Sequence, residues 1–215
     1  MTTPTSRADE LRDLVDAVGN DLASVHEARE EALRACRATI QACSKTIRAI
    51  HRDDRAVAAE FTAKAQAALA VAQRVLVGHP ALAAVGFLHD AEKEFAEARL
   101  FAAFIDGAAL PGPSGVGVAP AAWLNGLAEA TSELRRHLLD RLRAGDLARA
   151  EAMLTTMDDA YGALITVDFP DAVTGGLRRT TDALRAVLER TRSDLTTTVL
   201  QSRLQAAITE RLPPA

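Results

Sequence analysis

The sequence has few aromatic residues and few cysteines, and it contains no long apolar run. Phe, Trp and Tyr make up 4% of the 215 residues, and the cysteines are Cys36 and Cys43. On one predicted helix these two lie about 10 Å apart along the axis, which is too far for them to form a disulfide with each other. We therefore expect two small core residues in a reducing compartment, and we assign the protein to the cytoplasm.

Charge of one sign is not in large excess either. The chain has 25 Lys and Arg against 29 Asp and Glu, for a net charge of -4. A net negative charge does not by itself predict nucleic-acid binding, so such a function would require a local basic patch. No apolar run reaches the length that crosses a bilayer, and the first residues, Met-Thr-Thr-Pro-Thr-Ser, lack the apolar core of a signal peptide. The sequence therefore predicts neither membrane association nor a globally basic protein.

Alanine, leucine, arginine and glutamate dominate, and hydrophobic residues make up 48% of the chain. With apolar residues at helical spacing, this composition predicts a single all-α domain spanning residues 1–215. Near the N-terminus we expect a helix capped by Ser6 together with Glu10, and a weak point at Gly19-Asn20. A loop is expected from 107 to 120, where four Gly and three Pro occur. The main helices are predicted at about 21–52, 55–77, 80–106, 120–143, 147–167 and 177–210.

Two glutamates fall on the apolar face of the helix predicted for 80–106. At about 100° per residue, Glu94 and Glu97 share a face with most of that helix's phenylalanines, whereas Glu92 and Arg99 fall on the opposite side. An unpaired charge among phenylalanines would cost several kcal/mol, so the two acids need a cation, a basic partner or a proton. Two interpretations follow: the acids pair with arginines of a neighbouring helix, or they form a metal or acid/base site.

The helix predicted for 21–52 carries a basic stripe beside its apolar one. One interpretation is a solvated face whose cations pair with neighbouring acids. The other is a track about 25 Å long that binds nucleic-acid phosphates without reading bases. His51 lies at the edge of the apolar stripe and is interpreted as a packed histidine. The basic stripe falls within an arc of about 80° and consists of Arg34, Arg37, Lys45, Arg48 and Arg52.

Four blocks of the sequence resemble the translin family, in the family's order and over about residues 28–205. Residues 95–104, Phe-Ala-Glu-Ala-Arg-Leu-Phe-Ala-Ala-Phe, resemble the family's central helix, on the side of its nuclease-active branch, translin-associated factor X, which has Glu-x-x-Glu-Ala there. Residues 44–52 are similar to the Ser-Lys-x-x-Ile and Leu-His-Arg pieces of the first helix. Residues 123–136 are similar to Tyr-Leu-x-Gly-x-x-Asp-x-x-x-Glu-Leu-x-Arg, and 191–195 resemble the closing segment.

The resemblance implies a single all-α domain of about seven helices that assembles into a hollow homo-oligomer, an octamer, with nucleic acid inside. It also implies which acids act. Glu94 and Glu97 match the paired glutamates, and Glu129 stands where the nuclease-type members have an acid. Glu133 stands where both branches have Glu, as a structural charge partner.

The last acid implied by the resemblance lies in the helix predicted for 147–167, and its position stays open. Matching Tyr161 to the phenylalanine of the family's Asp-Gly-Phe puts Asp159 in the place of a functional aspartate. Helical periodicity alone favours Asp158. Matching Tyr161 to a tyrosine would place Gly162 there and leave the position without an acid.

Three hypotheses for function remain. The first is a metal-dependent endoribonuclease that cleaves single-stranded RNA, with Glu94, Glu97 and Asp159 as the catalytic set and Mg²⁺ or Mn²⁺ held by these and Glu129, because carboxylate oxygens suit these ions. In this hypothesis the basic stripe binds the strand. The second is a non-catalytic protein that binds single-stranded RNA or DNA, like translin itself, which lacks the paired glutamates. The third is a helical scaffold whose buried acids form salt bridges.

Overall fold

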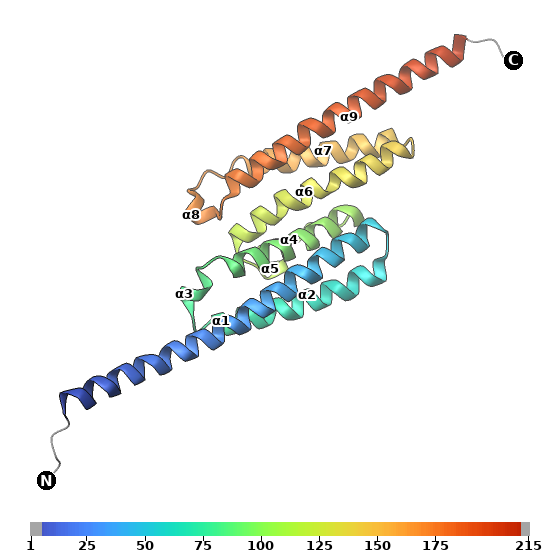
Figure 1. Ribbon diagram of the computed structural model, residues 1–215. Helices are drawn as coiled ribbons and strands as arrows, with labels where there is room; N and C mark the ends of the chain where they lie inside the picture. Colours follow the sequence, from blue (N-terminus) through green and yellow to red (C-terminus); the bar gives the residue numbers. More distant parts are fainter. Residues whose placement is uncertain (1–5, 212–215) are drawn as a thin grey trace.

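The structure, a computed structural model, describes residues 6–211, which form helices and connecting turns without a strand in that range (Figure 1). This confirms the prediction of an all-α protein. Three helices in the described range are single turns: α3 (Pro80–Ala83), α5 (Pro113–Val116) and α8 (Asp171–Thr174). The long helices are α1 (Arg7–His51), α2 (Arg55–Leu76), α4 (Phe87–Asp106), α6 (Pro120–Arg143), α7 (Leu147–Leu164) and α9 (Leu177–Arg211).

Helix α1 differs from the prediction at its start. It is continuous over 45 residues and passes through Gly19-Asn20 without a break. A single exposed glycine inside a helix costs only about 1 kcal/mol, which the long flanking turns outweigh. Ser6 is the N-cap as predicted, but its hydroxyl accepts a hydrogen bond from the backbone N–H of Asp9, and its side-chain partner is Asp9 rather than Glu10.

The helix predicted for 80–106 is divided in two. Gly86 adopts a left-handed conformation with φ of 103°, which a continuing right-handed helix cannot contain, so α4 begins afresh at Phe87. The loop predicted for 107–120 is present and contains the single turn α5. The remaining long helices agree with the predicted boundaries to within a few residues.

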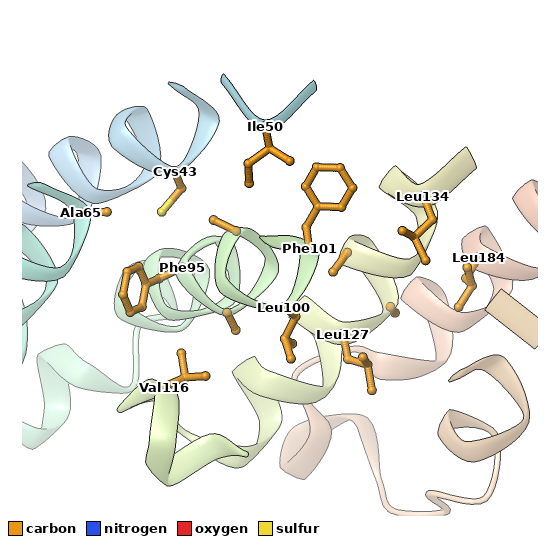
Figure 2. Close-up of a cluster of buried hydrophobic side chains, with 14 of the residues drawn as sticks. Cys43, Ile50, Ala65, Phe95, Leu100, Phe101, Val116, Leu127, Leu134 and Leu184 are labelled. Atoms are coloured by element: carbon orange, nitrogen blue, oxygen red, sulfur yellow. The ribbon is translucent and has the colours of Figure 1, made fainter. Parts of the chain in front are cut away.

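Helix α4 is the central element of the molecule, because it packs between α1 and α6 (Figure 1). Its phenylalanines Phe95 and Phe101 are fully buried. Figure 2 shows α1 side chains such as Ile50 on one side of α4, and Leu127 and Leu134 of α6 on the other. Both faces of α4 are therefore covered, and a charged side chain on either face meets protein rather than bulk water.

Gly126 sets the distance between α4 and α6. A Cβ atom at this position would lie 2.7 Å from the Ala96 Cβ and 2.8 Å from the Lys93 carbonyl oxygen, closer than real Cβ atoms approach such groups. The two helices thus meet at a point where only glycine fits. Glu129 lies about one turn after Gly126, and this contact brings it up to α4.

The two ends of the long outer helices extend away from the bundle in opposite directions (Figure 1). Within the described residues, no helix is both long and apolar enough to span a bilayer. The extended part of α1 nevertheless carries exposed large apolar side chains at helical spacing. They are Leu11, Leu14, Val15, Val18, Leu22 and Val25, and the end of α9 exposes Leu200, Leu204 and Ile208.

Candidate metal centre and nucleic-acid interface

Three glutamates form a compact group between α4 and α6. Glu94 and Glu97 come from α4 and Glu129 from α6, and each offers a carboxylate oxygen within 4.8 Å of those of the other two. The pair on α4 is one helical turn apart, and the close approach at Gly126 supplies the third member. The structure therefore brings together three of the four metal ligands predicted from the sequence. Hard carboxylate oxygens in so small a volume fit Mg²⁺ or Mn²⁺.

In the part of the chain that the structure describes, Lys93 is the cation that contacts this group. Its Nζ lies 2.8 Å from Oε1 of Glu129 and 3.5 Å from Oε1 of Glu94. Burial lowers the pKa of Lys93, but the hydrogen bond and charge of Glu129 outweigh it, and the net shift is upward. The basic partner of Glu94 is therefore a lysine of the same helix. Within the described residues no arginine pairs with Glu94 or Glu97, so the interpretation that these two acids pair with arginines of a neighbouring helix is wrong.

Glu97 is the most deeply buried member of the group, with 8% of its surface exposed. Among the described residues it forms no salt bridge, since Lys93 contacts only Glu94 and Glu129. Burial raises its pKa to about 9, and the charges of Glu94 and Glu129 add to the shift. The pKa of Glu94 is also raised, by burial in opposition to Lys93. Without a bound cation, Glu97 therefore holds a proton at neutral pH.

Glu92 is a buried acid that the sequence did not single out. Periodicity placed it opposite the phenylalanines, yet only 6% of its surface is exposed, because that face of α4 is covered too. Its carboxylate accepts hydrogen bonds from Gln73 Nε2 at 2.8 Å and from the backbone N–H of Ala119 at 3.1 Å. Glu92 thus ties α4 to α2 and to the start of α6. The sequence contained one signal of this burial: alanines occur on all sides of α4, as expected for a helix that is surrounded by neighbours.

Neither candidate aspartate of α7 belongs to the three-glutamate group. Asp158 accepts a hydrogen bond from Arg192 Nη2 at 2.7 Å, so it pairs α7 with α9. Asp159 lies on the exposed face of α7. Its assignment as a fourth ligand stays a prediction.

The basic stripe lies on the outer face of α1. Arg34, Arg37, Arg48 and Arg52 are exposed, and Lys45 is half-buried with its Nζ 5.0 Å from the centre of the Phe61 ring. Within residues 6–211, no member of the stripe forms a salt bridge. The interpretation that these cations pair with neighbouring acids therefore has no support in the described part of the chain, and the charges remain available to an anion.

His51 is a packed histidine, as predicted. Its side chain is 3% exposed, and its Nε2 lies 2.7 Å from Oε2 of Glu133. Its ring lies 5.0 Å from that of Phe101, centre to centre. Glu133 thus serves as a hydrogen-bond partner for a histidine, one turn beyond Glu129 on α6.

Comparison with solved structures shows what this arrangement is similar to. Structures of AfC3PO, alone and in complex with duplex RNA, match with a TM-score of 0.73 and 32% sequence identity, over 87% of this chain and 97% of AfC3PO. The apo-NeC3PO structure matches with a TM-score of 0.77 over 92% of this chain and 99% of that one, but at 15% identity it shows the fold alone.

Comparison with curated sequences gives a match over a shorter part of the chain. An uncharacterized protein of Methanocaldococcus jannaschii is 34% identical over 83 residues, which are 39% of this chain and 37% of that protein. The match therefore spans little more than a third of that relative's length. No family model matches the chain.

The fold and the acidic group together define an all-α helical bundle with carboxylates of two neighbouring helices gathered at one point. The extent and identity of the match to AfC3PO show that the chain belongs to the translin/C3PO family. The family resemblance of the four sequence blocks is thereby confirmed.

Proposed function

We propose that the protein is a metal-dependent endoribonuclease of the nuclease-active branch of its family, acting on single-stranded RNA. The observation that carries this proposal is the group of Glu94, Glu97 and Glu129, whose carboxylate oxygens lie within 4.8 Å of one another. With Glu97 ionised the three carboxylates carry three negative charges, and among the described residues Lys93 is the cation that contacts them, so two negative charges stay unbalanced. A divalent cation at this place would supply the missing positive charge.

The proposed ligands of Mg²⁺ or Mn²⁺ are Glu94, Glu97 and Glu129, with Asp159 as a proposed fourth. When bound, such a cation polarises a phosphate and lowers the pKa of a water molecule that attacks it. Glu97 must release its proton to act as a ligand, because its pKa is raised to about 9 in the cation-free protein. In that state the Lys93 ammonium group contacts both Glu94 and Glu129 and balances one of their two negative charges.

The basic stripe of α1 is the proposed strand-binding surface. Its cations contact phosphates, so we expect binding that depends on salt and little on base sequence. Single-stranded RNA is the proposed substrate, and single-stranded DNA could bind through the same phosphate contacts. AfC3PO, a related protein, has been solved in complex with duplex RNA. That complex supports RNA as the partner class here.

The proposed active form is a homo-oligomer, an octamer enclosing the strand, in the cytoplasm. The exposed apolar side chains on the extended part of α1 support assembly, since a stripe from Leu11 to Val25 would otherwise face water. We take a second copy of this chain as the occupant of that stripe, because both extended ends of the molecule carry apolar residues of the same kind. The two buried cysteines fit a reducing compartment.

A second candidate function is single-strand binding without cleavage. Lys93 favours it, because its ammonium group already satisfies two of the three glutamates at 2.8 and 3.5 Å. In this case the acidic group is structural, and the basic stripe carries the whole function.

The deciding experiment measures cleavage of a labelled single-stranded RNA with and without Mg²⁺. Glu97→Gln keeps the shape of the side chain and removes its charge, so cleavage should fall by about two orders of magnitude or more while strand binding persists. Glu92→Gln is the matched control, because Glu92 is equally buried on the same helix but lies outside the acidic group. Cleavage that needs no divalent cation, or that survives Glu97→Gln, would reject the acidic group as the catalytic metal site. Strand binding without cleavage at any Mg²⁺ concentration would reject the nuclease in favour of the binding protein.

A further inference from the structure

A pocket of about 560 Å³ lies beyond the acidic group, where α1, α4 and α6 end and α7 begins. On α6, the residues Glu129, Glu133, His137 and Arg141 follow one another at four-residue spacing and so share one face. The first of them belongs to the acidic group, and the last two line the pocket. At 1.5 Å per residue, His137 lies about 12 Å and Arg141 about 18 Å along the helix from Glu129.

Two nitrogen atoms at this pocket are buried without a partner. His51 Nδ1 and Arg141 Nε have no hydrogen-bond partner in the described residues, and both side chains line the pocket. The side chain of His51 is 3% exposed and is held in place through Nε2 by Glu133. Buried polar atoms in folded proteins are almost always paired, so two unpaired nitrogens in residues that line the same pocket call for a partner there.

The charges around the pocket favour an anion. Two aspartates line it, but each is already engaged: Asp53 by Arg55, and Asp140 by Arg143. Arg141, by contrast, forms no salt bridge within residues 6–211. Burial lowers the pKa of His137, and the charge of Arg141 lowers it further. Arg141 therefore contributes a positive charge that no salt bridge within the described residues neutralises, and its effect on the pKa of His137 is opposed by the charges of Asp140 and Asp53.

We propose that this pocket binds a phosphate group of the nucleic-acid strand, with the Arg141 guanidinium as principal ligand and the imidazoles of His51 and His137 beside it. An arginine fork suits the planar pairs of phosphate oxygens better than any other side chain. The inference rests on the proposed function, since it takes the strand to be held at the acidic group. The pocket then fixes a second phosphate of the same strand on the same face of α6, and so sets its register.

The test begins with phosphate itself, on the full-length protein without divalent cation. Inorganic phosphate should bind by calorimetry, and Arg141→Ala should weaken it by about tenfold or more. Arg136→Ala should leave it unchanged, because Arg136 is an exposed arginine of the same helix that does not line this pocket. In the wild type, phosphate should slow modification of Arg141 by phenylglyoxal and leave that of Arg136 unaltered, a readout that needs no variant to fold. Failure of wild type to bind phosphate, or equal effects at the two arginines, would overturn the proposal.

A competition experiment separates this proposal from the nuclease. A single-stranded oligonucleotide should displace inorganic phosphate from wild type and from Glu97→Gln alike, since Glu97 does not line the pocket. Oligonucleotides with and without a terminal phosphate are compared as competitors. Displacement that requires the terminal phosphate would identify a strand end as the occupant of the pocket, and equal displacement would identify an internal phosphate. If phosphate binds but no oligonucleotide displaces it, the assignment to the strand is overturned. If the oligonucleotide displaces phosphate but the protein does not cleave RNA, the phosphate-binding pocket is supported and the nuclease proposal is rejected.

Discussion

At the scale of the residue, Glu97 couples folding to pH. Its pKa is raised from 4.5 to about 9 in the folded, cation-free protein, mainly by burial. Between these two values the folded state binds a proton that the unfolded chain has lost. The stabilising contribution is complete below the unfolded pKa and is lost as the pH rises through the folded pKa.

We therefore expect the free energy of unfolding of the cation-free protein to fall with rising pH, by up to about 1.4 kcal/mol per pH unit across this window. Glu97→Gln cannot titrate and should lose that slope, so it should exceed the wild type in stability near pH 8. Denaturant titrations of both proteins at several pH values measure this. Parallel pH profiles of the two proteins would show that Glu97 is already ionised in the folded state.

The same proton competes with a cation. Wild-type affinity for Mn²⁺ should rise by up to about tenfold per pH unit as the pH approaches 9, because one proton leaves when the ion binds. Glu97→Gln should bind Mn²⁺ weakly, with little of this dependence. Direct titration with Mn²⁺ gives both slopes. A wild-type affinity independent of pH would remove Glu97 from the ligand set.

At the scale of the element, Gly126 is the contact on which the acidic group depends. Ala at this position would place Cβ 2.7 Å from the Ala96 Cβ and 2.9 Å from the Glu97 backbone nitrogen. We expect Gly126→Ala to separate α4 from α6, with a loss of about 1–3 kcal/mol and weaker Mn²⁺ binding, because Glu129 moves with its helix.

Gly162→Ala is the matched control for that substitution. It lies within α7 with open space where the new Cβ would go, so it should be neutral or stabilise by about 1 kcal/mol or less. Thermal melts and Mn²⁺ titrations compare the two variants. Equal effects at both glycines would mean that the α4–α6 approach is not what assembles the site.

The basic stripe of α1 is also tested as an element. Replacing Arg48 and Arg52 with Ala should weaken binding of all single strands about equally, and lower the salt slope by roughly 0.7 per lost phosphate contact. Arg185→Ala with Arg190→Ala removes the same charge from α9, where both arginines are exposed, and should leave the slope unaltered. Fluorescence anisotropy over a series of salt concentrations measures it. If the α1 substitutions do not change the salt slope, the basic stripe does not bind the strand and is an ordinary solvated surface.

At the scale of the whole molecule, the extended α1 predicts assembly. An octamer of 22.8 kDa chains would have a mass of about 180 kDa by light scattering. Val18→Glu with Leu22→Glu should shift the mass toward smaller species, because a charge in an apolar interface is costly. Asn20→Glu, on the opposite face of the same turn, should not. A wild-type monomer at micromolar concentration would contradict both the shell and the role given to α1.

The sequence by itself determined the helices, the pair Glu94 and Glu97 on one face, and the cations of the basic stripe. Each of these follows from a helical period that repeats within a few residues, so no knowledge of neighbours is needed. The exceptions also have local causes, as at Gly86, where one left-handed residue divides the helix predicted for 80–106. Glu129 was placed from the family resemblance, and the structure brings it to the pair.

Only the tertiary structure decided how these groups are paired and buried. Both faces of α4 are covered, which buries Glu92, and Lys93 pairs with Glu94 and Glu129. Glu97 forms no salt bridge within residues 6–211. The tertiary structure also gathered His51, His137 and Arg141 around one pocket from helices far apart in the chain. Burial and pairing depend on which helix lies across from a given face and how closely it approaches. That distance is set by contacts such as Gly126 against Ala96, between positions that no local period relates.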